Sequence, residues 1–264
     1  MEQVKVNKSF WTVNDSGVYV ERDLNWEHYN WFDRARGNYD EDKEADLYNS
    51  MFHEIFDMYE LGSDGCDYER YGCQILPGDV VVDIGANIGL FSHRAELKGA
   101  SSVYAFEPIF ATYMALYLNS GPIIKTFKSA IHSSQKFVEM SIPEFKSNTG
   151  GAMLKERMLS MGRHGVIDEI ISTIDINSLF LPDMIGKIDF MKMDIEGSEL
   201  ECLSAISDEN LSSLRCLAVE FHLNVPGVSQ FKNSFVERCH RLGFMTFQNH
   251  YQGGQQITLN VWKQ

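Results

Sequence analysis

Short apolar runs alternate with helical stretches along the chain from residue 77 onward. Five of the runs are rich in β-branched or other apolar residues, which is typical of strands buried in a parallel sheet. We predict these strands at residues 79–84, 102–106, 123–127, 188–193 and 216–221. Helices are predicted at residues 90–98, 113–119, 199–206 and 231–242. This alternation predicts an α/β fold with right-handed crossovers.

The last part of the chain has a different pattern. Residues 244–250 and 256–262 both suit strands, and they flank Gly253 and Gly254. Two strands separated by a glycine-containing turn predict an antiparallel hairpin. A dinucleotide-binding sheet is usually parallel to its end, so the hairpin argues against that class of fold.

The first 70 residues are polar, acidic and rich in aromatic residues. Apolar residues at helical spacing predict a helix over residues 41–61, which Gly62 can end. We therefore divide the chain into an N-terminal helical and aromatic extension, residues 1–70, and a main domain, residues 71–264. The aromatic residues of the extension either pack the helical cap or cover a substrate pocket; they are Trp11, Trp26, Tyr29 and Trp31.

Composition and charge narrow the range of functions. The chain is 44% hydrophobic and 23% charged, so a packed core is expected. A net charge of −14 disfavours a nucleic-acid partner. The five cysteines form no CxxC pair, and the chain shows no secretory signal and no apolar run of about 18 residues. We expect a cytoplasmic protein with reduced thiols and no membrane partner.

Glycines cluster where the first predicted strand meets its helix, in the sequence D-I-G-A-N-I-G at residues 83–89. Gly85 and Gly89 allow the backbone to turn and to approach a ligand, with Asn87 between them. The helix that follows offers free N–H groups to an electronegative group. Asp83, at the end of the strand, is a candidate acceptor for an amino group or a bridging water.

Glu107 lies 24 residues after Asp83, at the end of the second predicted strand. A carboxylate in this position can accept hydrogen bonds from ribose hydroxyls. Ser129 and Ala130 follow the third strand and are candidates to flank an adenine, although an ordinary loop would look the same. An NAD(P)-dependent oxidoreductase is the alternative function, because NAD also binds such a sheet beside an acid that contacts the ribose. The spacing of Gly85 and Gly89 argues against it, because it differs from the G-x-G-x-x-G pattern that holds a pyrophosphate.

A second motif, I-D-F-M-K-M-D-I-E-G-S-E, spans residues 188–199. It places Asp194 at the end of the fourth strand, where ligands bind in open α/β sheets. Glu196 and Glu199 follow within the same turn; Glu199 suits the start of a helix, and Glu196 can simply shape the loop.

Together these motifs resemble the FkbM family of S-adenosylmethionine-dependent methyltransferases. The resemblance runs from about residue 77 to the C-terminus. It rests on residues 82–89, on Phe106-Glu107-Pro108, on Asn148-Thr149-Gly150-Gly151-Ala152, on residues 189–199 and on Glu220-Phe221-His222. It implies a Rossmann-like class I methyltransferase fold, S-adenosyl-L-methionine as cofactor, and O-methylation of a hydroxyl on a sugar, glycan or other small molecule. The expected cofactor-binding residues are Asp83, Gly85, Asn87, Gly89, Glu107, Ser129, Ala130 and Asp194.

Methyl transfer to an alcohol needs a base, because the hydroxyl proton must leave. Asp194 and His222 are the candidate catalytic residues, since each is predicted at the end of a strand. An unperturbed imidazole titrates near pH 6.5, although His222 could equally be bonded to a neighbouring acid. Asp194, Glu220 and His222 could instead hold a divalent ion; their spacing matches no known ligand motif, so a metal-free site is favoured.

Basic residues are concentrated at Lys155, Arg157, Arg163 and His164, between glycines. They could form a mobile lid that contacts an acidic or phosphorylated acceptor. A solvated helix face is the more common reason for such a run and is the interpretation that we favour. A third possibility for the whole chain is a binding module without catalysis, which Asp83, Glu107 and Asp194 argue against.

Overall fold

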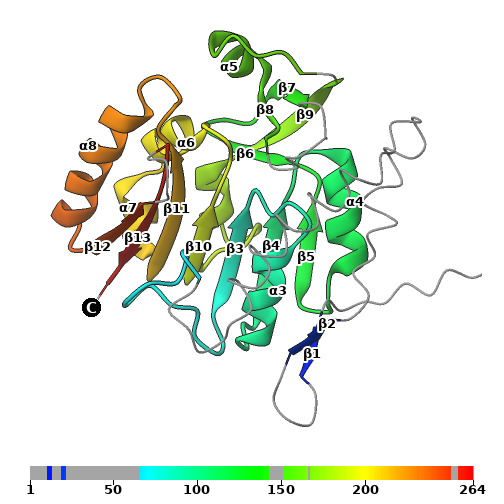
Figure 1. Ribbon diagram of the computed structural model, residues 1–264. Helices are drawn as coiled ribbons and strands as arrows, with labels where there is room; N and C mark the ends of the chain where they lie inside the picture. The colour runs from blue at the N-terminus through cyan, green and yellow to red at the C-terminus, as the bar shows by residue number, and fades with distance from the viewer. Residues whose placement is uncertain are drawn as a thin grey trace, which may run out of the picture.

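The computed structural model describes residues 11–13, 19–21, 66–142, 151–165, 167–250 and 255–263. A seven-stranded sheet runs through the centre of the described domain, in the order β12-β13-β11-β10-β3-β4-β5 (Figure 1). Its strands are β3 (Val80–Ile84), β4 (Ser102–Phe106), β5 (Ile124–Phe127), β10 (Phe190–Met193), β11 (Cys216–His222), β12 (Met245–His250) and β13 (Gln256–Trp262).

The pairing of these strands is parallel in the middle and antiparallel at one side. β3 lies between β10 and β4, and the pairs from β11 to β5 are all parallel. β13 runs antiparallel to both β11 and β12. The mixed sheet with its C-terminal hairpin confirms the class I methyltransferase fold.

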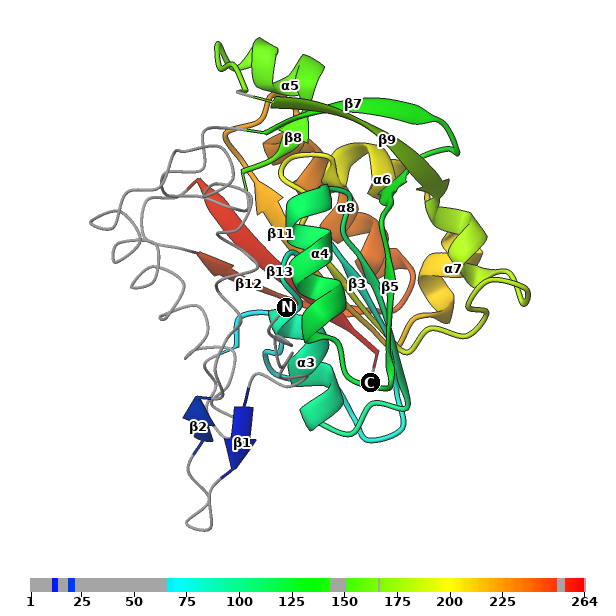
Figure 2. The ribbon, with the colours of Figure 1, turned by 90° about the vertical axis from the view of Figure 1, so that its right-hand side faces the viewer.

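Helices cover both faces of the sheet because the strand side chains alternate between two apolar clusters. Helices α3 (Leu90–Leu97) and α4 (Phe110–Asn119) pack with Val81, Val103 and Phe190. Helices α6 (Glu199–Ala205), α7 (Asp208–Ser213) and α8 (Val228–Arg241) pack on the other face with Val82, Met191 and Phe221 (Figure 2).

A second, four-stranded sheet lies above the carboxyl edge of the central one (Figure 1). It consists of β6 (Ala130–His132), β7 (Phe137–Ile142), β8 (Met153–Leu154) and β9 (Ile167–Asp175), with helix α5 (Lys155–Ser160) after β8 and the 3-10 helix η1 (Ile176–Phe180) after β9. The sequence analysis did not predict this sheet. Its strands are short or half exposed, so their apolar pattern is weak.

Most predicted boundaries hold within two or three residues. Helix α4 begins at Phe110 rather than at residue 113, and α8 begins at Val228 rather than at residue 231. Strand β11 continues through His222, so this histidine is the last residue of the strand and not the first after it. The extra pairing with β13, from Cys216 to His222, explains the longer strand.

In the N-terminal extension, strands β1 (Trp11–Val13) and β2 (Tyr19–Glu21) form a short antiparallel pair. The predicted helix at residues 41–61 lies outside the described residues, as do Trp26, Tyr29 and Trp31. The division at residue 70 stays a prediction. Of the helices in the described ranges, none has the length and apolar character needed to cross a bilayer.

Residues 66–75 pack onto the central domain, although residues 66–70 were assigned to the extension. Cys66, Tyr68 and Cys73 are buried with Phe91 of α3. Glu69 is buried among them and accepts hydrogen bonds from Arg94, from Lys98 Nζ at 2.7 Å and from the Ile75 N–H at 2.9 Å. This ion cluster joins the segment to α3.

We predict that Glu69→Gln lowers the free energy of unfolding by about 3 kcal/mol, because it removes a buried carboxylate from two cations. Urea unfolding followed by circular dichroism measures this change. The matched control is Glu139→Gln, which removes a half-exposed carboxylate from Lys155 and should cost less than about 1 kcal/mol. Equal losses in the two variants would contradict the role given to Glu69.

Candidate functional site

A pocket opens where β3, β4 and β10 end, between the central sheet and the small sheet. Six of the predicted site residues line it: Gly85, Asn87, Glu107, Ser129, Ala130 and Asp194. The rest of the lining is largely apolar and includes Phe106, Ile109, Ile131, Val138, Met140 and Leu154. Residues far apart in sequence therefore form one concave surface, as the sheet topology requires.

The loop after β3 has a backbone that few residues adopt. Gly85 and Asn87 have φ values of 76° and 50°, in the left-handed region. A Cβ atom at Gly85 would lie 1.7 Å from the Asp194 carbonyl oxygen, so only glycine fits between the ends of β3 and β10. Within the described residues, Asn87 Oδ1 is buried without a hydrogen-bond partner. It lies in a residue that lines the pocket, so a ligand donor is a suitable partner for it.

Glu107 is fixed in the pocket by three donors. Its carboxylate accepts from the Asn87 N–H at 3.0 Å, the Ile109 N–H at 2.9 Å and the Thr112 hydroxyl at 2.7 Å. Burial raises the pKa of Glu107, although these three hydrogen bonds work against the rise. A carboxylate has about four acceptor positions, so the bonds orient the group and still leave it capacity for a ligand hydroxyl.

Asp83 and Gly89 do not line the pocket, unlike the other predicted cofactor residues. Asp83 is fully buried beneath the loop, where it accepts from the Ser92 hydroxyl at 2.7 Å and lies 3.3 Å from Lys192 Nζ. Lys192 also donates to the Gly85 carbonyl at 2.8 Å. Burial alone would lower the pKa of Lys192, but Asp83 and Asp194 outweigh it and raise the pKa. Asp83 therefore helps to hold the loop, and Gly89 is the N-cap residue of α3. Their part in cofactor binding stays a prediction.

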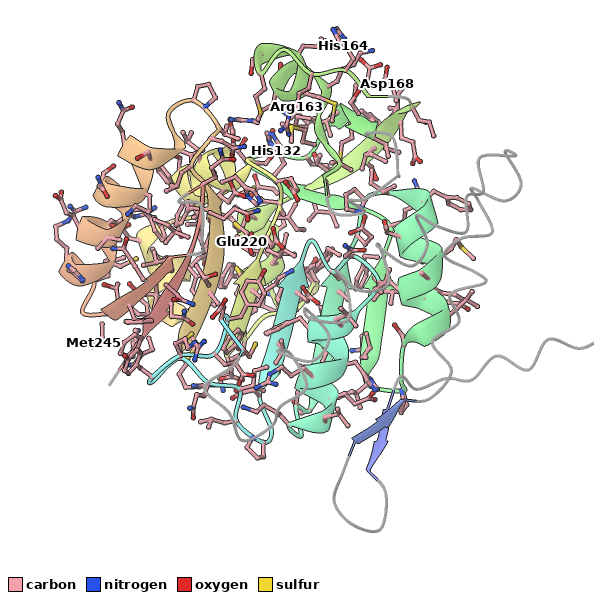
Figure 3. All side chains as sticks on the ribbon, viewed as in Figure 1. His132, Arg163, His164, Asp168, Glu220 and Met245 are labelled. Atoms are coloured by element: carbon pink, nitrogen blue, oxygen red, sulfur yellow. The ribbon has the colours of Figure 1, made fainter. Side chains whose placement is uncertain are left out.

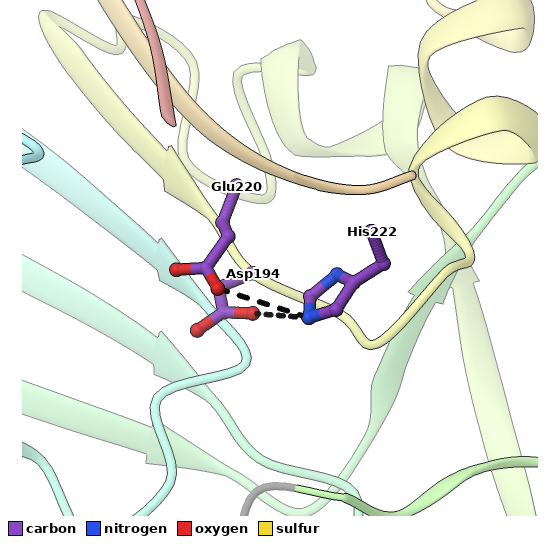
Figure 4. Close-up of side chains that lie close together, drawn as sticks. All are labelled: Asp194, Glu220 and His222. Carbon is purple, nitrogen blue, oxygen red and sulfur yellow. Dashed lines mark ion pairs between the residues drawn. The ribbon is translucent and has the colours of Figure 1, made fainter. Parts of the chain in front are cut away.

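An acid cluster continues the pocket toward β11, and the sequence analysis predicted part of it. Asp194 Oδ1 and Glu220 Oε1 lie 4.0 and 3.8 Å from His222 Nε2 (Figure 4). Glu196 Oε2 lies 3.3 Å from the same nitrogen. On the other side of the ring, His222 Nδ1 lies 2.8 Å from Glu199 Oε1. Glu199 is fully buried, so it holds the imidazole in one orientation.

These charges shift the titration of the cluster. Burial works against a charged imidazole, but the hydrogen bond to Glu199 and the charges of Glu196 and Asp194 raise the pKa of His222 to about 10. Burial also raises the pKa of Glu196 and of Glu220 to about 8, and Asp194 adds to both shifts. The neighbouring acids thus favour the charged form of His222, and its bond to Glu199 is the arrangement expected as the alternative to a free base. Its part in catalysis stays a prediction.

Tyr68 is a site residue that the sequence analysis did not identify. Its hydroxyl lies 2.8 Å from Glu220 Oε2 and 3.1 Å from Asp194 Oδ2. It comes from the segment before β3, 126 residues away from Asp194. Neither periodicity nor a motif marks it, because only the packing of residues 66–75 brings it to the cluster.

The basic residues near α5 form ion pairs of their own. Lys155 lies 2.9 Å from Glu139 and 2.8 Å from Asp168, while Arg157 pairs with Glu201 of α6 and is mostly buried. The helix face is therefore not uniformly solvated, which corrects the favoured interpretation. Arg163 and His164 lie at the outer end of this region, away from Glu220 (Figure 3).

The sequence profile of the Methyltransferase FkbM domain matches residues 83–247. The chain is 28% identical over 189 residues to 31-O-demethyl-FK506 methyltransferase FkbM of Streptomyces tacrolimicus, covering 62% of this chain and 72% of that protein. It is 28% identical over 192 residues to methyltransferase sdnD of Sordaria araneosa, covering 61% and 72%. It is 29% identical over 154 residues to the hexuronic acid methyltransferase AglP of Haloferax volcanii, covering 56% and 57%.

We predict that Gly85→Ala destabilises the protein far more than Gly78→Ala. Both glycines have a positive φ, but a Cβ at Gly78 meets no atom within 4 Å. The φ strain alone costs about 1–2 kcal/mol, so Gly78→Ala measures that cost and Gly85→Ala adds the clash with Asp194. Thermal unfolding of both variants checks the difference, and equal losses would show that the two strands can separate freely.

Proposed function

The chain belongs to the FkbM methyltransferase family, and from this premise we propose that it methylates a hydroxyl oxygen of a sugar or another small molecule. Its cofactor is S-adenosyl-L-methionine. One observation carries the proposal: a single pocket gathers Glu107, the glycine loop and Asp194 at the carboxyl edge of the sheet. The acid cluster at one side of that pocket then gives an acceptor hydroxyl a place to lose its proton.

We place the adenosyl group between Glu107 and the small sheet. Glu107 accepts from the ribose hydroxyls, as acids at the end of the second strand do. Ser129 and Ala130, with the apolar side chains of Val138 and Met140, line the part of the pocket that would hold the adenine. The loop at Gly85 and Asn87 would hold the methionine part, next to Asp194 in the same pocket.

The reaction is an in-line displacement at the sulfonium. A lone pair of the acceptor oxygen forms the new C–O bond, and the electrons of the breaking C–S bond return to sulfur as a neutral thioether. The hydroxyl proton passes to the Asp194 carboxylate, whose side chain is 28% exposed and lines the pocket. The pocket contributes mainly by aligning the two reactants. His222 positions the acids around it.

The names of two relatives support the choice of acceptor. One is named for a 31-O-demethyl substrate and another for a hexuronic acid. The first name denotes transfer to an oxygen, and the second denotes a sugar acid as the acceptor. The oxidoreductase alternative is weaker, because Gly85 and Gly89 lack the dinucleotide spacing.

We predict that the protein binds S-adenosylhomocysteine and not NAD in isothermal titration calorimetry. Glu107→Gln should weaken this binding by about 10- to 100-fold, since hydrogen bonds to a charged group contribute about 1.5–3 kcal/mol. The control Glu156→Gln alters an exposed acid on α5 and should bind as the wild type does. Binding of NAD with no binding of S-adenosylhomocysteine would overturn the proposed function.

We predict that methyl transfer to a hexuronic acid yields a methyl ether, which survives mild alkali in mass spectrometry. Asp194→Asn should lower kcat by about 100-fold or more, because the proton acceptor is lost, while S-adenosylhomocysteine still binds. The control is Asp183→Asn, at an exposed position. An alkali-labile methyl ester would refute transfer to a hydroxyl, and full activity of Asp194→Asn would exclude Asp194 as the proton acceptor.

A further inference from the structure

Three side chains of the acid cluster have the arrangement of a metal site. Asp194, Glu220 and His222 each offer a ligand atom, and these atoms lie within 4.8 Å of one another. A cation with ligands at about 2.1 Å places them about 3–4.2 Å apart. The three atoms are therefore close to the required spacing and need only a small inward movement.

The histidine gives independent evidence for a ligand. His222 is 4% exposed, and within the described residues its Nε2 has no hydrogen-bond partner, although it faces the carboxylates of Asp194, Glu196 and Glu220. Its other nitrogen is held by Glu199 at 2.8 Å. A metal-binding histidine almost always donates its other ring N–H to a carboxylate, a backbone carbonyl or a water, which fixes the tautomer and the ring orientation. Glu199 is a partner of this kind.

Glu199, which orients the His222 ring, is itself held in one position. Its Oε1 also accepts from the Gly197 N–H at 2.9 Å, and the residue is fully buried. The same backbone turn, with Glu196 at a φ of 51° and Gly197 at 97°, carries Glu196 to the His222 ring. The imidazole is thus aimed at the pocket by groups that cannot easily move.

Charge balance also favours a cation. Asp194, Glu196, Glu199 and Glu220 surround one imidazole, and Lys192 Nζ lies 3.9 Å from Asp194 but on the side of Oδ2. A divalent cation would be attracted to the carboxyl oxygens gathered here.

From this geometry we propose that Asp194 Oδ1, Glu220 Oε1 and His222 Nε2 bind a divalent cation of the magnesium or manganese class beside the cofactor pocket. Carboxylates suit Mg²⁺ and Mn²⁺, and the imidazole nitrogen makes Mn²⁺ the better match of the two. The metal-free expectation from the sequence is thereby revised. The sequence analysis named these three residues as an alternative, but their spacing matched no ligand motif because they follow from two different strands.

The cation's role rests on the proposed function. Held by Asp194, Glu220 and His222, a cation would polarise the acceptor hydroxyl and make its proton more acidic. Tyr68 has one hydroxyl hydrogen, and its shorter contact is to Glu220 Oε2. Asp194 Oδ2 therefore remains able to take the proton while Oδ1 holds the cation, and the bonds made and broken are those of the displacement described above.

To test this, the full chain is first treated with EDTA to remove bound metal. It is then titrated with Mn²⁺ alone, and the EPR signal of free Mn²⁺ is measured. We expect saturation at one ion per chain. Glu220→Gln and His222→Asn should each weaken binding at least about 10-fold. The control Glu237→Gln, an exposed acid on α8, should leave binding unchanged. Circular dichroism confirms that each variant is folded.

Each outcome decides one point. No saturable binding up to millimolar Mn²⁺, or equal binding by wild type and Glu220→Gln, would overturn the site. Turnover that is the same in the EDTA-treated and the Mn²⁺-loaded protein would overturn the cation's part in the reaction. Calorimetry with S-adenosylhomocysteine on the EDTA-treated protein separates the two proposals. If S-adenosylhomocysteine binds but Mn²⁺ does not, only the metal site is refuted. If S-adenosylhomocysteine does not bind, the proposed function is refuted.

Discussion

Lys192 is the buried cation on which the carboxyl edge of the sheet depends. Its side chain is 5% exposed, and its Nζ reaches Asp83, Asp194 and the Gly85 carbonyl. A buried charge is tolerated only when it is paired and hydrogen-bonded. The three partners lie on β3, on the loop after it and just beyond β10. The contacts of this one ammonium group therefore fix the spacing of two neighbouring strands. The glycine loop and the acid cluster are both arranged around this point.

The pocket and the acid cluster are consequently parts of one network. Asp194 lines the pocket, contacts Lys192 and meets the Tyr68 hydroxyl. Tyr68 in turn reaches Glu220, and the segment that carries it is joined to α3 through Glu69 and Arg94. A change at the acceptor side therefore acts on groups that also hold the loop beneath the cofactor.

Much of this arrangement could be predicted from local sequence. The strands of the central sheet are short apolar runs, and Glu107 and Asp194 follow from their positions at strand ends. Other features depend on contacts between distant segments. Tyr68 reaches the cluster only through the packing of its segment. Asp83 turns inward because Lys192 lies beneath the loop. The pKa of His222 is raised by Glu199 and Glu196, which come from another part of the chain. The small sheet was missed because its strands have weak apolar patterns.

The position of β13 has a consequence for how the domain is assembled. This strand lies between β11 and β12 and pairs along the whole of β11, including Glu220 and His222. Until residues 256–262 have been synthesised, the backbone groups of β11 remain an open edge, which is a surface that invites pairing with other chains. Strand β13 therefore protects the edge of the strand that carries Glu220 and His222 from pairing with another chain.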